Sequence, residues 1–308
     1  MNSTALPMPV VSTGRSAQQR GLWLGLLGVA IFALTLPLTR IAVGTPDAPQ
    51  FSAAFIALGR AAVAGFLSGI YLLATRAGLP HRADWLPLAL VALGVVFGFP
   101  LCTSFALQHV EAVHASVVIG ILPLATAVMG AWLHRQRPSA GFWLCAAVGA
   151  SLVVAYALLH SGSGQLGLQA ADGLLLLATA LGALGYGFGA KLSQRMLPAH
   201  VICWALVISS PLTWPASFFY WPTAPISSAA WGAFAYGALF SMWLGFFAWY
   251  RGLALGGTVR VSQVQLLQPF LSMLFAVPLL GEKIDSLTIG FCVAVIATVF
   301  IGKKMRIR

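Results

Sequence analysis

Three glutamines lie within one long apolar stretch of the sequence, residues 259–280. They are Gln263, Gln265 and Gln268. An amide group is costly to bury in an apolar environment unless it bonds to a partner or to water. On a helix, Gln265 and Gln268 share a face, whereas Gln263 points well away from Gln265. The spacing predicts that Gln265 and Gln268 line a path or site for a polar solute. Hydrogen bonding between membrane helices is the alternative.

Two prolines, Pro123 and Pro269, interrupt apolar stretches. A proline inside a helix lacks an N–H donor and disturbs the carbonyl group four residues earlier, here that of Ile119 or Gln265. Free carbonyl groups at membrane depth need a protein partner or a wet cavity. We expect both prolines to kink their helices beside a cavity, with Gly120 close to the first. A packed kink without a cavity is the alternative.

Arg60 lies near the middle of an apolar stretch, about 14 Å along its helix if that helix starts at Phe51. No Asp or Glu lies within an apolar stretch to pair with it. A carboxylate of a bound solute is therefore one candidate partner. We favour a structural role for Arg60, in which the guanidinium bonds to backbone carbonyl groups or the side chain extends to the membrane surface.

Aromatic side chains are dense in the eighth apolar stretch. Tyr236, Phe240 and Trp243 are spaced to share one helical face. Together with Phe97 and Tyr186 from other stretches, they could wall an apolar cavity. Packing against lipid is the alternative for each ring.

No motif in the sequence indicates a cofactor, a metal ion or a catalytic residue. No CxxC, HExxH, GxSxG or Walker loop occurs. The four cysteines lie in apolar stretches without metal-ligand spacing, so we expect free, packed thiols. His114 could sense pH, but we interpret it as a plain histidine near the membrane surface. We predict no cofactor, no metal site and no enzymatic activity.

Ten apolar stretches must position these residues. They cover residues 22–44, 51–75, 85–107, 113–133, 140–159, 173–194, 201–220, 229–250, 259–280 and 286–302. Each is long enough, or nearly so, to cross about 30 Å of hydrocarbon at about 1.5 Å per helical residue. The chain is 59% hydrophobic and only 7% charged, which is typical of a protein surrounded by lipid. We predict an all-α, polytopic membrane protein with ten transmembrane helices.

The basic residues predict the orientation of these helices. With the N-terminus in the cytoplasm, every Lys and Arg faces that side except Arg40, Arg60 and Lys283. Both termini are then cytoplasmic. The net charge of +11 is spread over many short loops and forms no single basic stripe, so nucleic-acid binding is not expected.

The sequence divides into two related halves. We expect a disordered tail over residues 1–20, a first five-helix repeat over residues 21–160 and a second over residues 171–303. Residues 112–133 align with residues 258–279, and this alignment matches Pro123 with Pro269. Because each half holds an odd number of helices, the second must be inverted relative to the first. Such inverted repeats place a substrate site near the bilayer midplane.

Two related segments and one isolated stretch carry a resemblance to a known family. They are ALQHVEAVHASVVIGILPLATAVMGAWL (Ala106–Leu133), RGLALGGTVRVSQVQLLQPFLSMLFAVPLLGEK (Arg251–Lys283) and ALGRAAVAGFL around Arg60. They resemble the EamA-type transporters of the drug/metabolite transporter superfamily, over nearly the whole chain. The resemblance implies a ten-helix carrier of the bacterial inner membrane. Its central cavity is lined mainly by the first, third, fourth, sixth, eighth and ninth helices, and Arg60 lies on the second helix, which is mostly outside that cavity. The first half departs from the pattern, with HRQRP (His134–Pro138) in place of GEK (Gly281–Lys283).

These features together predict an exporter of small amphipathic metabolites, such as amino acids, that works by alternating access as a monomer in the bilayer. The predicted substrate-binding residues are Gln265, Gln268, Tyr186, Tyr236, Trp243, Phe97, Ser116 and Gly120. With no carboxylate in a membrane helix, facilitated diffusion or exchange is favoured over proton coupling. The alternatives are a flippase for lipids or lipid-linked sugars and a membrane-embedded enzyme. An enzyme would need convergent acidic or histidine side chains, which are scattered along this sequence.

Overall fold

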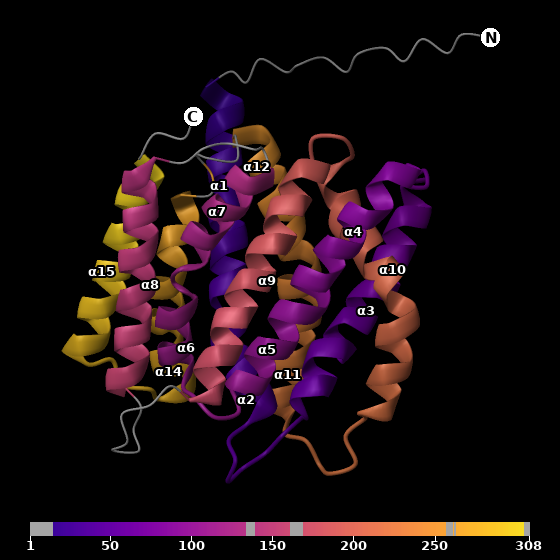
Figure 1. Ribbon diagram of the computed structural model, residues 1–308. Coiled ribbons are helices and arrows are strands. Elements are labelled where there is room, and N and C mark those ends of the chain that lie inside the picture. Colours follow the sequence, from indigo (N-terminus) through magenta and orange to yellow (C-terminus); the bar gives the residue numbers. More distant parts are fainter. Residues whose placement is uncertain (1–14, 134–138, 161–168, 257–260, 262, 305–308) are drawn as a thin grey trace.

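The computed structural model describes residues 15–133, 139–160, 169–256, 261 and 263–304. Its first half contains α1 (Arg15–Ala33), α2 (Thr35–Val43), α3 (Ala53–Ala74), η1 (Arg82–Asp84), α4 (Trp85–Val91), η2 (Ala92–Gly98), α5 (Phe99–Ala106), α6 (Ala112–Ile119), α7 (Leu122–Leu133) and α8 (Ala140–His160). Its second half contains α9 (Ala170–Leu192), α10 (Pro198–Phe219), α11 (Ser228–Tyr236), η3 (Gly237–Leu244), α12 (Gly245–Gly256), η4 (Gln263–Leu267), α14 (Gln268–Leu280) and α15 (Ser286–Lys304). Figure 1 shows these helices side by side in one bundle.

In the described part of the chain, these elements make ten helical passes. Five passes are built from more than one element: α1 with α2, α4 with η2 and α5, α6 with α7, α11 with η3 and α12, and η4 with α14. Six passes are helices long and apolar enough to cross a membrane, and the others contain shorter apolar helices. The predicted all-α membrane fold with ten transmembrane helices is confirmed.

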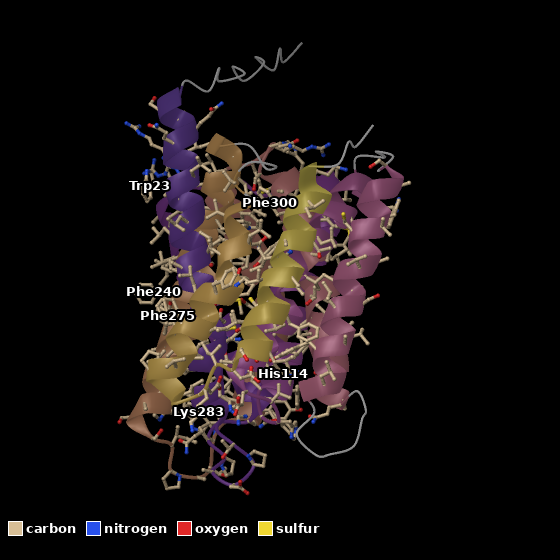
Figure 2. All side chains as sticks on the ribbon, turned by 90° about the vertical axis from the view of Figure 1, so that its left-hand side faces the viewer. Trp23, His114, Phe240, Phe275, Lys283 and Phe300 are labelled. Atoms are coloured by element: carbon tan, nitrogen blue, oxygen red, sulfur yellow. The ribbon has the colours of Figure 1, made fainter. Side chains whose placement is uncertain are left out.

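The two halves run in opposite directions through the bundle. We call the end where α1 begins the α1 end, and the opposite end, where α9 begins, the α9 end (Figure 1). Figure 2 places Trp23 and Phe300 toward the α1 end, and His114 and Lys283 toward the α9 end. Since the first half begins at one end and the second half at the other, the predicted inversion of the repeats is confirmed.

The packing of the helices repeats when the two halves are exchanged. Helix α3 packs against its equivalent α10, and α8 against its equivalent α15. Likewise, α1 packs along α12, while α9 packs along α4, η2 and α5. Glycines allow close approach in both of these contacts. A side chain at Gly21 of α1 would overlap the backbone of Gly256 of α12, and a side chain at Gly94 of η2 would overlap the backbone of Gly185 of α9.

Large apolar side chains cover the outer surface of the bundle. Leu73, Phe66, Leu212 and Leu274 are each more than half exposed, as a lipid-facing surface requires. The four cysteines, Cys102, Cys145, Cys203 and Cys292, are free. Among the described residues, no group of three or more His, Cys, Asp and Glu side chains could hold a metal ion.

Candidate solute-binding site

The passes that carry Pro123 and Pro269 are broken, not kinked. Helix α6 ends at Ile119 and α7 begins at Leu122, so Pro123 lies in the first turn of a new helix. Pro269 lies in the first turn of α14, directly after the 3-10 segment η4. A proline fits a first turn because the N–H group it lacks has no helical partner there. The expectation of kinked continuous helices is therefore corrected to two helix starts at equivalent places.

The two breaks lie against each other and enclose a small cavity. A Cβ at Gly120 would lie 3.4 Å from Cγ of Pro269, so the first break lies within contact distance of the second. We call the space the amide cavity. It is lined by Leu36, Ser116, Ile119, Leu122, Pro123, Gln265, Gln268 and Pro269. The structure thus brings Ser116, Gln265 and Gln268 together.

Both glutamines have polar atoms without a protein partner. Gln265 is 1% exposed, and neither its Oε1 nor its Nε2 has a hydrogen-bond partner among the described residues. Oε1 of Gln268 is also buried without one. The Ser116 hydroxyl donates to the carbonyl oxygen of Ala112 over 2.7 Å, which leaves its oxygen able to accept a bond. An unpaired buried amide is unfavourable, so these groups are suited to bind a polar solute or water.

A second cavity adjoins the first, since Leu36 and Gln268 line both. We call it the aromatic cavity. Its other lining residues are Phe32, Thr35, Arg60, Val95, Phe99, Pro100, Gly182, Tyr186, Ser241, Met242 and Phe246. The ring centroid of Phe32 lies 5.1 Å from that of Phe246 and 6.5 Å from that of Tyr186, so these three rings form one wall. The cavities together offer amides on one side and aromatic rings on the other.

The first pass is broken beside these cavities and is held there by the second half. Pro37 has no N–H group to donate to the carbonyl oxygen of Ala33 in the preceding turn. Ser272 of α14 donates its hydroxyl to that oxygen over 2.8 Å. The Tyr236 hydroxyl donates to the carbonyl oxygen of Ile31 over 3.0 Å. The carbonyl groups at this break are therefore satisfied by side chains from the other repeat, as membrane depth requires.

Three predicted aromatic residues lie elsewhere. Tyr236 stacks on Phe240, which is 43% exposed, and Trp243 packs against Tyr71 and not into either cavity. Phe97 likewise lines neither cavity. A shared face was inferred for Tyr236, Phe240 and Trp243 from α-helical periodicity, whereas η3 is a π-helix. Phe97 lies in a second π-helix, η2. The i→i+5 bonds of a π-helix rotate the following side chains relative to an α-helix.

Instead, neighbours of these aromatic residues face the aromatic cavity. They are Val95, Phe99, Ser241, Met242 and Phe246. The sequence contains no clear signal for a π-helical turn, so this set was not predicted.

Arg60 combines a structural contact with a place on the cavity wall. It is 3% exposed, and its Nε–H donates to the carbonyl oxygen of Ile56 over 3.0 Å, the kind of backbone bond expected from the sequence. Its Nη1 also donates to Oγ1 of Thr39 over 3.3 Å. The expectation that the second helix lies outside the cavity is wrong for this residue, because Arg60 lines the aromatic cavity.

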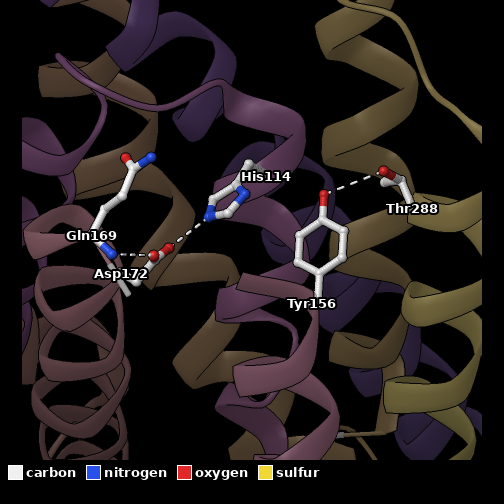
Figure 3. A network of polar contacts seen from close by, with 5 residues as sticks. All are labelled: His114, Tyr156, Gln169, Asp172 and Thr288. Carbon is white, nitrogen blue, oxygen red and sulfur yellow. Dashed lines mark hydrogen bonds and ion pairs between the residues drawn. The ribbon is translucent and has the colours of Figure 1, made fainter. Parts of the chain in front are cut away.

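A group of polar side chains, which we call the interhalf cluster, joins the two repeats at the α9 end (Figure 3). Nε2 of His114 lies 2.6 Å from Oδ1 of Asp172, and Oδ2 of Asp172 accepts a bond from the backbone N–H of Gln169 over 3.0 Å. The hydroxyl groups of Tyr156 and Thr288 lie 3.3 Å apart. The cluster thereby links α6 and α8 of the first half with α9 and α15 of the second.

Asp172 was expected outside the sixth apolar stretch, but it lies in the first turn of α9 and is 2% exposed. Helix α9 starts earlier than the apolar pattern because Gln169 and Asp172 form a reciprocal capping box. The expectation that no carboxylate lies in a spanning helix is therefore wrong. The preference for facilitated diffusion or exchange depended on that expectation and is withdrawn. The spacing of Gln169 and Asp172 is the signal that could have revealed this helix start.

Glu282 forms a second link between the halves at the same end. Its Oε1 and Oε2 accept bonds from the backbone N–H groups of Ala112 and Val113 over 2.9 and 2.8 Å, at the start of α6. Burial raises the pKa of the Glu282 carboxyl, and this effect exceeds the opposite effect of the two N–H bonds. The GEK segment thus has a structural role in the second half. The departure at His134–Pro138 lies outside the described residues.

Comparison with known proteins gives consistent results. The model of the EamA-like transporter family matches residues 19–158 and again residues 169–302. The "Uncharacterized transporter YdeK" of Bacillus subtilis (strain 168) is 45% identical over 91% of this chain and 96% of its own length. A crystal structure of another protein superposes with a TM-score of 0.60 over 94% of this chain and 98% of the other. The sequence identity in that superposition is 19%, so it shows a shared fold only.

Proposed function

Since this chain belongs to the EamA-like transporter family, and is thus a multi-pass membrane transporter, we propose that it exports small amphipathic metabolites, amino acids among them. The membrane in question is the bacterial inner membrane, with both termini in the cytoplasm. The lining residues of both cavities come from one chain, which supports a monomer as the transporting unit. We propose that the chain has no enzymatic activity.

One observation carries this proposal: unpaired amides and an aromatic wall adjoin each other inside the bundle. Gln265 and Gln268 supply hydrogen-bonding groups at the point where two passes are broken. Tyr186 and its neighbouring rings supply apolar contact area next to Gln268. A solute with a polar head and an apolar body matches both surfaces. Broken helices around a central site are typical of transporters built from inverted repeats.

The links at the α9 end support alternating access. The His114–Asp172 contact and the bonds from Glu282 to α6 each join one half to the other. A solute leaving the cavities through the α9 end requires these contacts to separate. Because the halves are related by inversion, the protein can exchange this arrangement for one that is closed at the α1 end.

The orientation can be tested in intact cells. Asp47 is exposed in the connection after α2 at the α9 end, and Ala83 is exposed in η1 near the α1 end. After replacement of the native cysteines, an impermeant maleimide should label Asp47→Cys and leave Ala83→Cys unlabelled until the cells are opened. The reverse labelling pattern would overturn the proposed orientation of the protein in the membrane. The proposal of export would then fall as well, because it depends on this orientation.

Flux measurements test the function itself. The purified chain in liposomes should release preloaded labelled amino acids faster than protein-free liposomes do. The same liposomes, carrying a fluorescent lipid in one leaflet, report lipid scrambling. Lipid scrambling without solute release would favour a flippase. The absence of both activities would refute transport of this solute class.

A further inference from the structure

The Arg60 guanidinium is a buried cation whose donors are only partly used. A guanidinium has five N–H donors in a planar fork. Two hydrogen bonds, from Nε–H to the carbonyl oxygen of Ile56 and from Nη1 to Oγ1 of Thr39, fix the orientation of the guanidinium. The remaining N–H groups have no other partner in the described part of the chain, and the side chain lines the aromatic cavity. Arg60 therefore has hydrogen-bond donors available at a cavity wall.

The protein supplies no negative charge for this cation. All six acidic residues lie in the described part of the chain, and none forms an ion pair with Arg60. Nor does any of them line the aromatic cavity. A buried charge without a partner is strongly unfavourable, so a cation retained at this position indicates a counter-charge from outside the chain.

The surroundings hold the guanidinium ready for such a partner. Gly237 lies directly against Arg60, and a Cβ at this position would overlap Cδ of the arginine. Glycine thus leaves the room that the arginine needs, while Ile56 and Thr39 fix its orientation. A fork held in this way binds a carboxylate by two parallel bonds with little further loss of freedom.

We propose, resting on the transport function above, that Arg60 binds the carboxylate of the transported solute. The rings of Phe32, Tyr186 and Phe246 then contact the apolar body of the solute. One cation balances a carboxylate, whereas a phosphate group carries about 1.5 to 2 negative charges at pH 7. No carboxylate lines the cavity to pair with an ammonium group of the solute. The carboxylate therefore determines binding more than the ammonium does.

Matched pairs of small molecules test this site. The full chain in detergent is titrated with 3-phenylpropionate and 3-phenylpropanamide, then with leucine and leucinamide, and the apparent Kd is taken from the rise in Tm. Wild type should bind each carboxylate at least about tenfold more tightly than its amide, as expected for hydrogen bonds to a charged group. Arg60→Gln should remove this preference, and the exposed Arg82→Gln should keep it.

Two further results extend the test. Gly237→Ala keeps the charge but displaces the guanidinium, so it should also weaken the preference for the carboxylate. This variant provides the test if Arg60→Gln does not fold. Equal binding of acid and amide by wild type, an unchanged preference in a folded Arg60→Gln, or no binding of either carboxylate overturns the proposal. These results do not decide the transport function itself. If liposomes with the wild-type protein still carry neutral solutes, that function is supported even when the Arg60 proposal fails, and it is refuted only if no solute is carried.

Discussion

Replacing Ser272 by alanine should destabilise the protein by removing the partner of one backbone oxygen. The carbonyl oxygen of Ala33 has lost its helical donor to Pro37, and the Ser272 hydroxyl donates to it over 2.8 Å. Ser272 is fully buried, so water cannot easily replace the hydroxyl. The Ser272→Ala variant therefore leaves a buried carbonyl group without a donor.

The size of the effect follows from the cost of an unsatisfied buried polar group. That cost is about 1 to 3 kcal/mol, and we expect the free energy of unfolding to fall by this amount. Since 1 kcal/mol shifts Tm by about 2 to 4 °C in domains of roughly 150 to 250 residues, a loss of several degrees should be measurable in detergent. Ser104→Ala is the matched control, because the buried Ser104 hydroxyl has no partner in the described part of the chain.

A double-mutant cycle makes the prediction specific. Pro37→Ala restores an N–H group that can donate to the Ala33 carbonyl oxygen, so Ser272→Ala should cost less in that background. The assay is the Tm of the four proteins measured by intrinsic tryptophan fluorescence. If Ser272→Ala lowers Tm equally with Pro37 and with Ala at position 37, the hydroxyl does not compensate for the proline and the reasoning is refuted.

Three further predictions concern the cavities, the packing of α1 on α12 and the α9 end. Gln265→Leu and Gln268→Leu should each weaken apparent substrate affinity several-fold in liposomes, because one hydrogen bond to a neutral group is worth about 0.5 to 1.5 kcal/mol; wild-type kinetics in both would remove them from the site. Gly21→Ala should lower stability by about 1 to 3 kcal/mol because a Cβ there would overlap the backbone of Gly256, whereas Gly173→Ala, with open space around it, should not; equal Tm values would contradict this. Burial raises the pKa of Glu282, so the folded protein binds this proton more readily than the unfolded chain, and stability from this group should increase as pH falls from the raised pKa toward the ordinary 4.5. Glu282→Gln should flatten that part of the Tm profile, and an unchanged profile would speak against the assignment.

The sequence by itself determined the fold of this protein. Continuous apolar stretches of sufficient length must form membrane helices, because only helices satisfy every backbone group within one stretch in lipid. The alignment of residues 112–133 with 258–279 and the odd number of helices in each half determined the inverted repeat. The same local reasoning identified Gln265 and Gln268, since buried amides are conspicuous in any apolar helix.

The direction of individual side chains was decided by the tertiary structure. Tyr236, Phe240 and Trp243 share one face only if their helix keeps the α-helical period, and the π-helical segment η3 changes that period. Phe97 lies in a second π-helical segment, η2. The sequence also could not show that Arg60 faces the aromatic cavity. That position depends on Thr39 and Gly237, which come from other passes and approach Arg60 only after the helices pack.

The contacts between the halves likewise exist only in the folded bundle. His114 and Asp172 are far apart in the sequence and bond over 2.6 Å, and Glu282 reaches the start of α6 from the opposite repeat. The hydrophobicity of a segment depends on which residues it contains and on their order along the chain, so the sequence determined which segments enter the membrane. Pairing of polar groups depends on which helix faces meet, and helix packing alone decided which residues form the cavities and close the α9 end.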